Sequence, residues 1–118
     1  MRAVTLDVSV LGLDDLRALR LGVQVVGHRA ALESRPHVAT FLGMLMSGLD
    51  DAIARRSRTG GAWDGSISLQ LDEPPNRPGE VVPDRELVVE YVELLRANLR
   101  LSIGVRAVCE SLVQQLRR

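Results

Sequence analysis

The sequence predicts a small, mostly helical α+β domain in the order strand, helix, helix, strand, long helix, with the two strands paired as an antiparallel ribbon. Two segments alternate apolar and polar residues with a period of two, as half-buried strands do. Three others repeat apolar residues at three- and four-residue steps, as amphipathic helices do. A chain of 118 residues fits a single domain, 1–118.

The two predicted strands lie far apart in the chain. Val4–Val10 alternates valine or leucine with polar residues, and Ser66–Asp72 alternates isoleucine or leucine with serine and glutamine. A two-stranded ribbon is only marginally stable alone. We therefore expect the two segments to pair and to lay their shared apolar face on the helices.

The two helices between the strands are expected to form an antiparallel hairpin. The first begins at Asp14 or Asp15, either of which can cap its N-terminus, and runs to about Glu33. Pro36 opens the second helix, because proline is favoured in a first helical turn. This helix runs to about Arg58, before a glycine pair that ends it.

Residues 84–118 are predicted to form one long C-terminal helix, preceded by a stiff connector at 73–83 that holds four of the five prolines. A continuous helix from Pro83 onward would reach roughly 54 Å, whereas a compact chain of this size is about 35 Å across. The helix must therefore bend, break or extend beyond its own domain. The helix carries a heptad stripe. Its members are Leu87, Tyr91, Leu94, Asn98, Leu101, Val105, Val108 and Leu112.

The second half of this helix is therefore expected to pair with a second copy of the chain. Asn98 falls in line with the stripe, where a buried asparagine can fix register and partner number. If the helix is rotated slightly, Asn98 faces solvent instead. Gly104 is the position where the helix would bend most easily. The predicted interface consists of Asn98, Leu101, Val105, Val108 and Leu112.

The charge composition excludes some classes of chemistry. All fifteen basic residues are arginine, which is typical of GC-rich coding and favours a bacterial source. Without lysine there is no Schiff-base nucleophile and no phosphate-loop lysine. A formal net charge of zero disfavours nucleic-acid binding. Three aromatic residues are too few for a base-stacking platform.

Cysteine and histidine usage excludes other sites. Cys109 is the single cysteine, which rules out an intrachain disulfide and favours a reduced, cytoplasmic setting. His28 and His37 lack the spacing that places two metal ligands on one helix face, so we expect neither a metal nor a cofactor. The longest uncharged apolar segment, His37–Leu49, is shorter than the roughly 20 residues of a membrane span.

The heptad helix and the lack of a catalytic constellation predict a non-enzymatic, homodimeric interaction module, an adaptor or regulator that binds another protein. The alternative is a small dimeric DNA-binding regulator or antitoxin. In that case Arg55, Arg56 and Arg58 contact phosphates, and Trp63 anchors in a groove or on a protein partner. The same arginines also suit a helix C-terminus, where they complement the helix dipole.

A third class is an enzyme or small-ligand binder built at the dimer seam. Its polar groups would be Tyr91, Glu90, Glu93 and His28. Each of the first three has a simpler interpretation. Tyr91 continues an apolar row and suits the core or an interface, and the two glutamates suit the solvated edges of an amphipathic helix.

Overall fold

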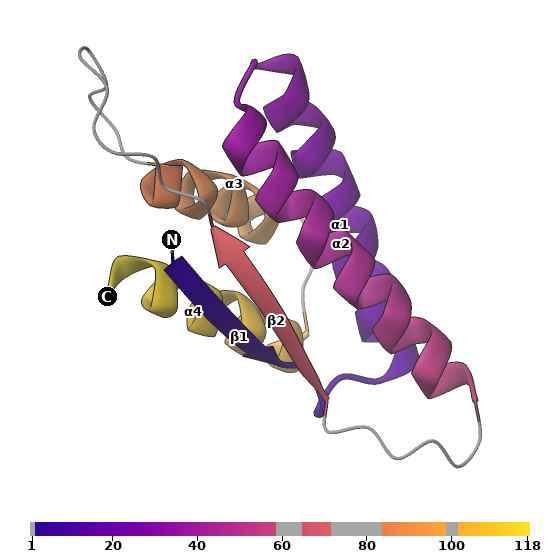
Figure 1. The fold of residues 1–118 in the computed structure, drawn as a ribbon. Helices are drawn as coiled ribbons and strands as arrows, with labels where there is room; N and C mark the ends of the chain where they lie inside the picture. Colours follow the sequence, from indigo (N-terminus) through magenta and orange to yellow (C-terminus); the bar gives the residue numbers. More distant parts are fainter. Residues whose placement is uncertain (1, 59–64, 72–83, 99–101) are drawn as a thin grey trace.

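The computed structural model describes residues 2–58, 65–71, 84–98 and 102–118, and shows a mostly helical α+β fold (Figure 1). The α+β class and the antiparallel two-stranded sheet are confirmed, but the last segment forms two helices. The elements are β1 (Arg2–Asp7), α1 (Leu13–Leu32), α2 (Pro36–Ser57), β2 (Ser66–Leu71), α3 (Asp84–Asn98) and α4 (Ile103–Arg117).

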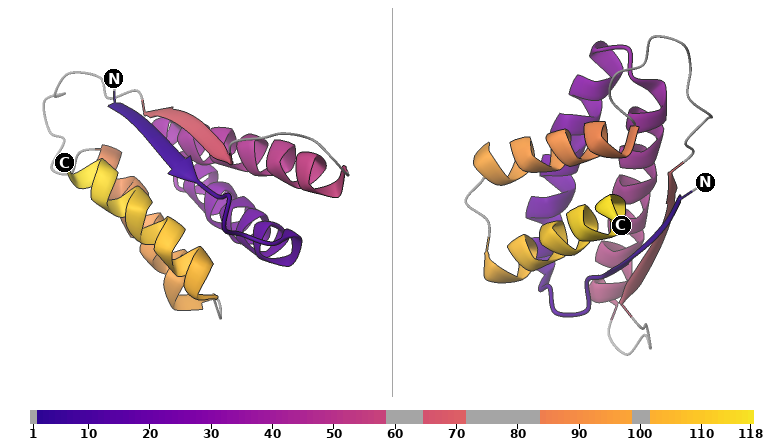
Figure 2. Two further views of the ribbon diagram at one scale, coloured as in Figure 1. Left: turned by 90° about the horizontal axis from the view of Figure 1, so that it is seen from below. Right: turned by 90° about the vertical axis from the view of Figure 1, so that its left-hand side faces the viewer.

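The sheet buries one face and exposes the other. β1 and β2 pair with Val4 opposite Leu69 and Leu6 opposite Ile67, and all four of these side chains are buried. The residues that alternate with them are exposed. The period-two pattern therefore places the apolar face of the ribbon on the helices, as predicted (Figure 2).

β1 ends earlier than Val10, the predicted end of the strand. The Ser9 backbone N–H donates to Asp7 Oδ1 at 2.9 Å, which turns the chain out of the strand direction. Val10 is 73% exposed as a result. Across the sheet, Gly65 has a φ of +83°, and a Cβ there would lie 2.5 Å from Ser9 Cβ, so the close approach requires glycine.

The predicted helical hairpin is present. α1 and α2 run antiparallel (Figure 1), joined by a turn in which Ser34 has a φ of 58°. Pro36 opens α2 as predicted. Both helices contribute to a single hydrophobic core. The buried residues of the pair are Leu16, Leu19, Gly22, Val23, Val26 and Ala30 of α1, and Val38, Phe41, Leu42, Leu45, Leu49 and Ala52 of α2.

The long helix predicted over 84–118 is divided into two helices. α3 ends at Asn98 and α4 begins at Ile103. Ser102, just before α4, has an extended backbone with φ −63° and ψ 163°, and its Oγ accepts a hydrogen bond from the Val105 N–H at 3.2 Å. Ser102 is therefore the N-cap of a new helix. α4 runs back beside α3 (Figure 2).

The break lets the chain cover its own apolar stripe. Folding back places α4 against α3 and along β1, so that no second copy is needed to remove this surface from water. Ion pairs join α3 to α4 at Arg96–Glu110, 3.3 Å, and Glu86–Arg117, 3.9 Å. The buried residues of α4 are Val105, Val108, Cys109, Leu112, Val113 and Leu116. The predicted connector 73–83 lies outside the described residues.

Gly48 sets the approach of α2 to β2. A Cβ at this position would lie 2.6 Å from Cγ2 of the buried Ile67 side chain. A Cβ added at Gly43, on the same helix, would meet nothing within 4 Å. The two glycines therefore differ only in what surrounds them.

This difference gives a stability prediction. We expect Gly43→Ala to stabilise the protein by up to about 1 kcal/mol through helix propensity alone. Gly48→Ala should destabilise it by about 1 kcal/mol or more, because a β-branched side chain in the core has to move. Urea unfolding followed by circular dichroism measures both. Stabilisation by both variants would contradict the close α2–β2 contact.

Candidate functional site

The described members of the predicted interface lie inside the chain. Val105, Val108 and Leu112 are 1%, 5% and 3% exposed, in the core that α4 shares with β1 and α3. The Asn98 side chain and Leu101 lie outside the described residues. These three side chains are covered by their own protomer and are therefore not available to a second copy.

An exposed apolar stripe lies on α1. Leu21, Val25 and Leu32 are 58%, 62% and 72% exposed, and their spacing of four and seven residues places them on one helix face. Ala18 and His28 are exposed on the same face. These five residues, the α1 stripe, recur at alternating three- and four-residue steps, which is heptad spacing.

An apolar groove borders the α1 stripe. It lies between α1 and α3 and has a volume of about 220 Å³. Gly22 forms part of its wall and adds depth because it has no side chain. The groove therefore suits an aliphatic side chain from a partner. Its lining residues are Leu21, Gly22, Val25, Val26 and Arg29 of α1, with Leu94 and Leu95 of α3.

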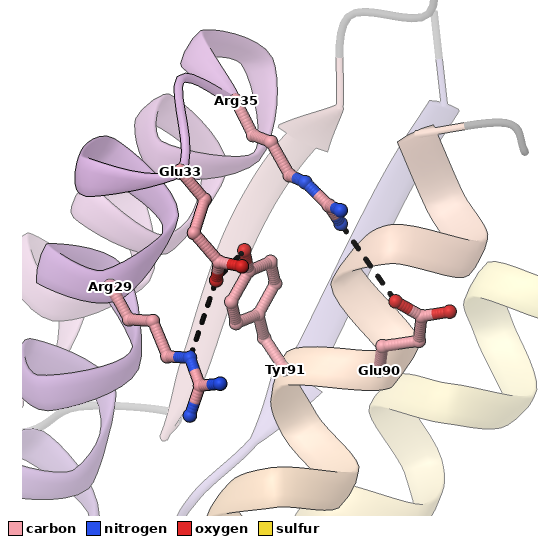
Figure 3. Close-up of polar contacts among 5 residues, drawn as sticks. All are labelled: Arg29, Glu33, Arg35, Glu90 and Tyr91. Atoms are coloured by element: carbon pink, nitrogen blue, oxygen red, sulfur yellow. Dashed lines mark hydrogen bonds and ion pairs between the residues drawn. The ribbon is translucent and has the colours of Figure 1, made fainter.

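A cluster of polar residues closes the end of the α1–α2 hairpin against α3 (Figure 3). The Tyr91 hydroxyl donates to Glu33 Oε1 at 2.7 Å, and Arg29 Nε donates to the same oxygen at 3.3 Å. The Arg35 guanidinium lies 5.8 Å from the centroid of the Tyr91 ring and 3.8 Å from Glu90 Oε2. The cluster therefore joins α1 and the α1–α2 turn to α3.

The electrostatics of this cluster favour a structural role for Tyr91. Burial, with the hydrogen bond to Glu33, raises the pKa of Tyr91 above its ordinary value. The same hydrogen bond and the nearby Arg29 charge lower the pKa of Glu33. At neutral pH the tyrosine is a fixed donor and the glutamate a fixed acceptor. Neither titrates near neutrality, where a general acid or base works best.

The other polar candidates do not converge on one point. Glu90 pairs with Arg35, whereas Glu93 pairs with Arg96 at 3.1 Å. His28 is exposed in the α1 stripe. Burial raises the pKa of the Cys109 thiol to about 11, so the thiol stays protonated at neutral pH. Within the described ranges, no three histidine, cysteine or acidic residues form a group that could hold a metal ion.

The three predicted phosphate contacts lie at the end of α2 but have different surroundings. Arg56 donates a hydrogen bond to the Ser9 carbonyl oxygen, so its guanidinium ties α2 to the turn after β1. Arg55 lines a second groove, between α2 and β2, together with Asp51. Arg58 is exposed at the C-cap. Trp63 lies outside the described residues.

The α1 stripe was missed from the sequence, although a signal was present. α1 has apolar residues on two opposite faces, and only the inward face was assigned. Leu21, Val25 and Leu32 are the surplus outside that face. By contrast, no local pattern pairs Glu33 with Tyr91, because 58 positions separate them.

Comparison with known proteins adds no assignment. No protein-family model, curated protein or solved structure matches the chain. Among the described helices, none combines the length and the hydropathy that a bilayer crossing requires. Function is therefore inferred from the geometry of the surfaces.

The Tyr91–Glu33 contact predicts an alkaline limit to stability. The folded protein holds the Tyr91 proton more tightly than the unfolded chain, so stability is unaffected below about pH 10 and falls as pH rises toward the folded-state pKa. Tyr91→Phe should cost about 1 kcal/mol at pH 7 and should remove this alkaline decline.

The measurement is urea unfolding at neutral and alkaline pH. Both proteins carry Cys109→Ala, because the buried thiol also has a raised pKa and would add its own alkaline decline. An equal decline in the tyrosine and phenylalanine proteins would contradict the assignment.

Proposed function

We propose that this chain is a non-enzymatic protein-interaction module that forms a homodimer through the α1 stripe. The observation that carries the proposal is the exposure of Leu21, Val25 and Leu32, each more than half exposed on one face of a regular helix. Large exposed apolar side chains gathered on one face typically mark an interaction site. The predicted self-association is retained, but it moves from the last helix to the first.

A second copy of α1 matches the stripe. When two copies meet antiparallel about a twofold axis at Val25, residues seven positions before and after it face each other. Ala18 of one copy then lies opposite Leu32 of the other, which pairs a small side chain with a large one. Side chains of the second copy that extend beyond the twofold axis enter the groove beside the stripe.

The expected dimer is weak. The stripe spans roughly 21 Å of helix. Burying its three large aliphatic side chains in both copies contributes on the order of 5–10 kcal/mol before the cost of association is subtracted. An association cost of at least about 4 kcal/mol leaves at most about 6 kcal/mol, so the dissociation constant is at best on the order of 10–100 μM. A dimer of this strength suits an adaptor or regulator whose assembly responds to its concentration.

The lining of the groove supports the non-enzymatic part of the proposal. Six of its seven lining residues are aliphatic or glycine. The seventh, Arg29, has its guanidinium in an ion pair with Glu33 at 3.3 Å. These residues include no nucleophile and no acid–base pair, so the groove is suited to apolar contact and not to bond making.

Charge on the α1 stripe should abolish the dimer. We expect Leu21→Glu and Val25→Glu to be monomers at every concentration tested, because each variant would bury a carboxylate in the apolar seam, and at position 25 the two carboxylates would also face each other across the axis. Sedimentation equilibrium between about 5 and 500 μM measures this, a range that brackets the expected dissociation constant.

Ile103→Glu is the matched control. Ile103 is 88% exposed on α4 and belongs neither to the stripe nor to the lining of its groove, so this variant should dimerise like the wild type. All three substitutions are at exposed sites and should leave unfolding stability nearly unchanged. A wild-type chain that stays monomeric at the highest concentration, or a control that dissociates like the stripe variants, would remove the proposal.

DNA binding through α2 is the second candidate. It is favoured by Arg55 and Arg58, which are exposed and have no ion pair within the described residues. It is weakened by Arg56, whose guanidinium is bonded to Ser9. A phosphate-binding surface of only two arginines predicts weak, salt-sensitive attraction.

A heparin column separates the two candidates. For the interaction module we expect elution in the flow-through at low salt, with no difference between the wild type and the double variant Arg55→Ala/Arg58→Ala. Retention that falls steeply with salt and is lost in the double variant would instead support DNA binding.

A further inference from the structure

The hydrogen bonds of the sheet show which backbone groups point away from it. The Val8 N–H donates to the Gly65 carbonyl at 2.8 Å, so alternate pairs along the register exchange hydrogen bonds, beginning with this one. The residues between those pairs direct their N–H and C=O groups to the two outer edges. On β2, these residues are Ser66, Ser68 and Gln70.

The outer edge of β1 is closed by a side chain. Gln115 of α4 accepts a hydrogen bond from the Thr5 N–H at 3.0 Å and donates one to the Thr5 carbonyl at 2.7 Å. Its carboxamide makes the two bonds that a neighbouring strand would make. This edge is therefore protected against strand addition.

The outer edge of β2 is open. The outward backbone groups of Ser68 and Gln70 have no hydrogen-bond partner in the described part of the chain. β2 also has no charged residue and no proline, the features that usually protect an edge. Unpaired groups in this geometry form a template for one more strand.

A groove runs beside this open edge. It has a volume of about 360 Å³, and α2 flanks β2 on the side away from β1 (Figures 1 and 2). Arg55 lies toward the end of the groove where β2 begins, and no ion pair engages it in the described residues. The lining residues are Met44, Ser47, Gly48, Asp51, Arg55, Ser66, Ile67 and Ser68.

We propose that the edge of β2 binds one extended segment of a partner protein as a third strand, with an acidic side chain of that segment opposite Arg55. Backbone hydrogen bonds to Ser68 and Gln70 supply affinity, and the α2 wall of the groove selects side chains. The short side chain of Ser47 and the lack of a side chain at Gly48 leave room for inward-facing residues of the segment.

A second copy of this chain does not fit the edge. Its own β2 could approach only together with its own α2, which flanks the same edge (Figure 2). Two helices would then compete for one groove, whereas packed helices need about 8–10 Å between their axes. A single strand with no flanking helix has no such conflict. This inference does not depend on the α1 dimer.

The test begins with a random octapeptide library displayed on phage and selected against the full chain. The enriched peptide is synthesised with a fluorescent label, and its binding is measured by anisotropy. Ser68→Pro should weaken binding at least tenfold, because proline removes the outward N–H and is tolerated at a strand edge. Ser47→Trp should do the same by filling the groove without changing the strand.

Controls are available on both molecules. Ala54→Trp, an exposed α2 position that does not line the groove, should bind normally. N-methylation of every second peptide residue can be placed in either of two phases. It should abolish binding in the phase whose N–H groups face β2 and preserve binding in the other phase. Arg55→Glu should prefer a peptide in which the acidic residue is replaced by lysine.

Three outcomes would overturn the inference. They are a selection that enriches no peptide, peptides that bind Ser68→Pro and Ser47→Trp like the wild type, and equal sensitivity to the two methylation phases. The variant Leu21→Glu should bind peptide normally, so loss of the dimer and loss of strand binding can be told apart.

Discussion

The return of α4 onto the sheet is the constraint on which the rest of the structure depends. Val105, Val108, Leu112 and Leu116 are covered only because the chain reverses between α3 and α4. The reversal also brings Gln115 to the outer edge of β1. One packing event therefore completes the core, closes one side of the sheet and leaves the other side open.

The same event decides which apolar surfaces are available to partners. The buried hydrophobic residues of α4 are already in contact with their own chain, so they have little further to gain from a second copy. The α1 stripe faces away from that core, so binding a partner can still remove its apolar surface from water. The two candidate surfaces also differ in kind, because α1 offers side-chain contact and β2 offers backbone hydrogen bonds.

Much of the fold could be predicted from the sequence, because its signals are local. The period-two segments, Pro36 and the inward stripe of α1 are each readable within about one turn or one strand. The break before α4 could not be predicted from the heptad stripe. Such a stripe shows which face of a helix is apolar, but a helical hairpin and a dimer cover that face equally well. The N-cap at Ser102 begins a new helix and so favours the helical hairpin over the dimer.

The candidate surfaces were harder to predict because exposure depends on the whole fold. Leu21 and Val25 resemble core residues in the sequence, and only the position of α3 shows that they remain uncovered. The open edge of β2 depends in the same way on pairing with a segment about sixty residues earlier. The arginines of α2 were placed on the correct helix end, but Arg56 is bonded to a turn that no local pattern indicates.

The bond between Thr5 and Gln115 also has a consequence for biosynthesis. The ribosome makes Thr5 110 residues before Gln115, whose amide covers the Thr5 backbone. During translation the nascent β1 strand therefore emerges with a bare edge. A chaperone that binds exposed strands would therefore act on this protein before α4 leaves the exit tunnel.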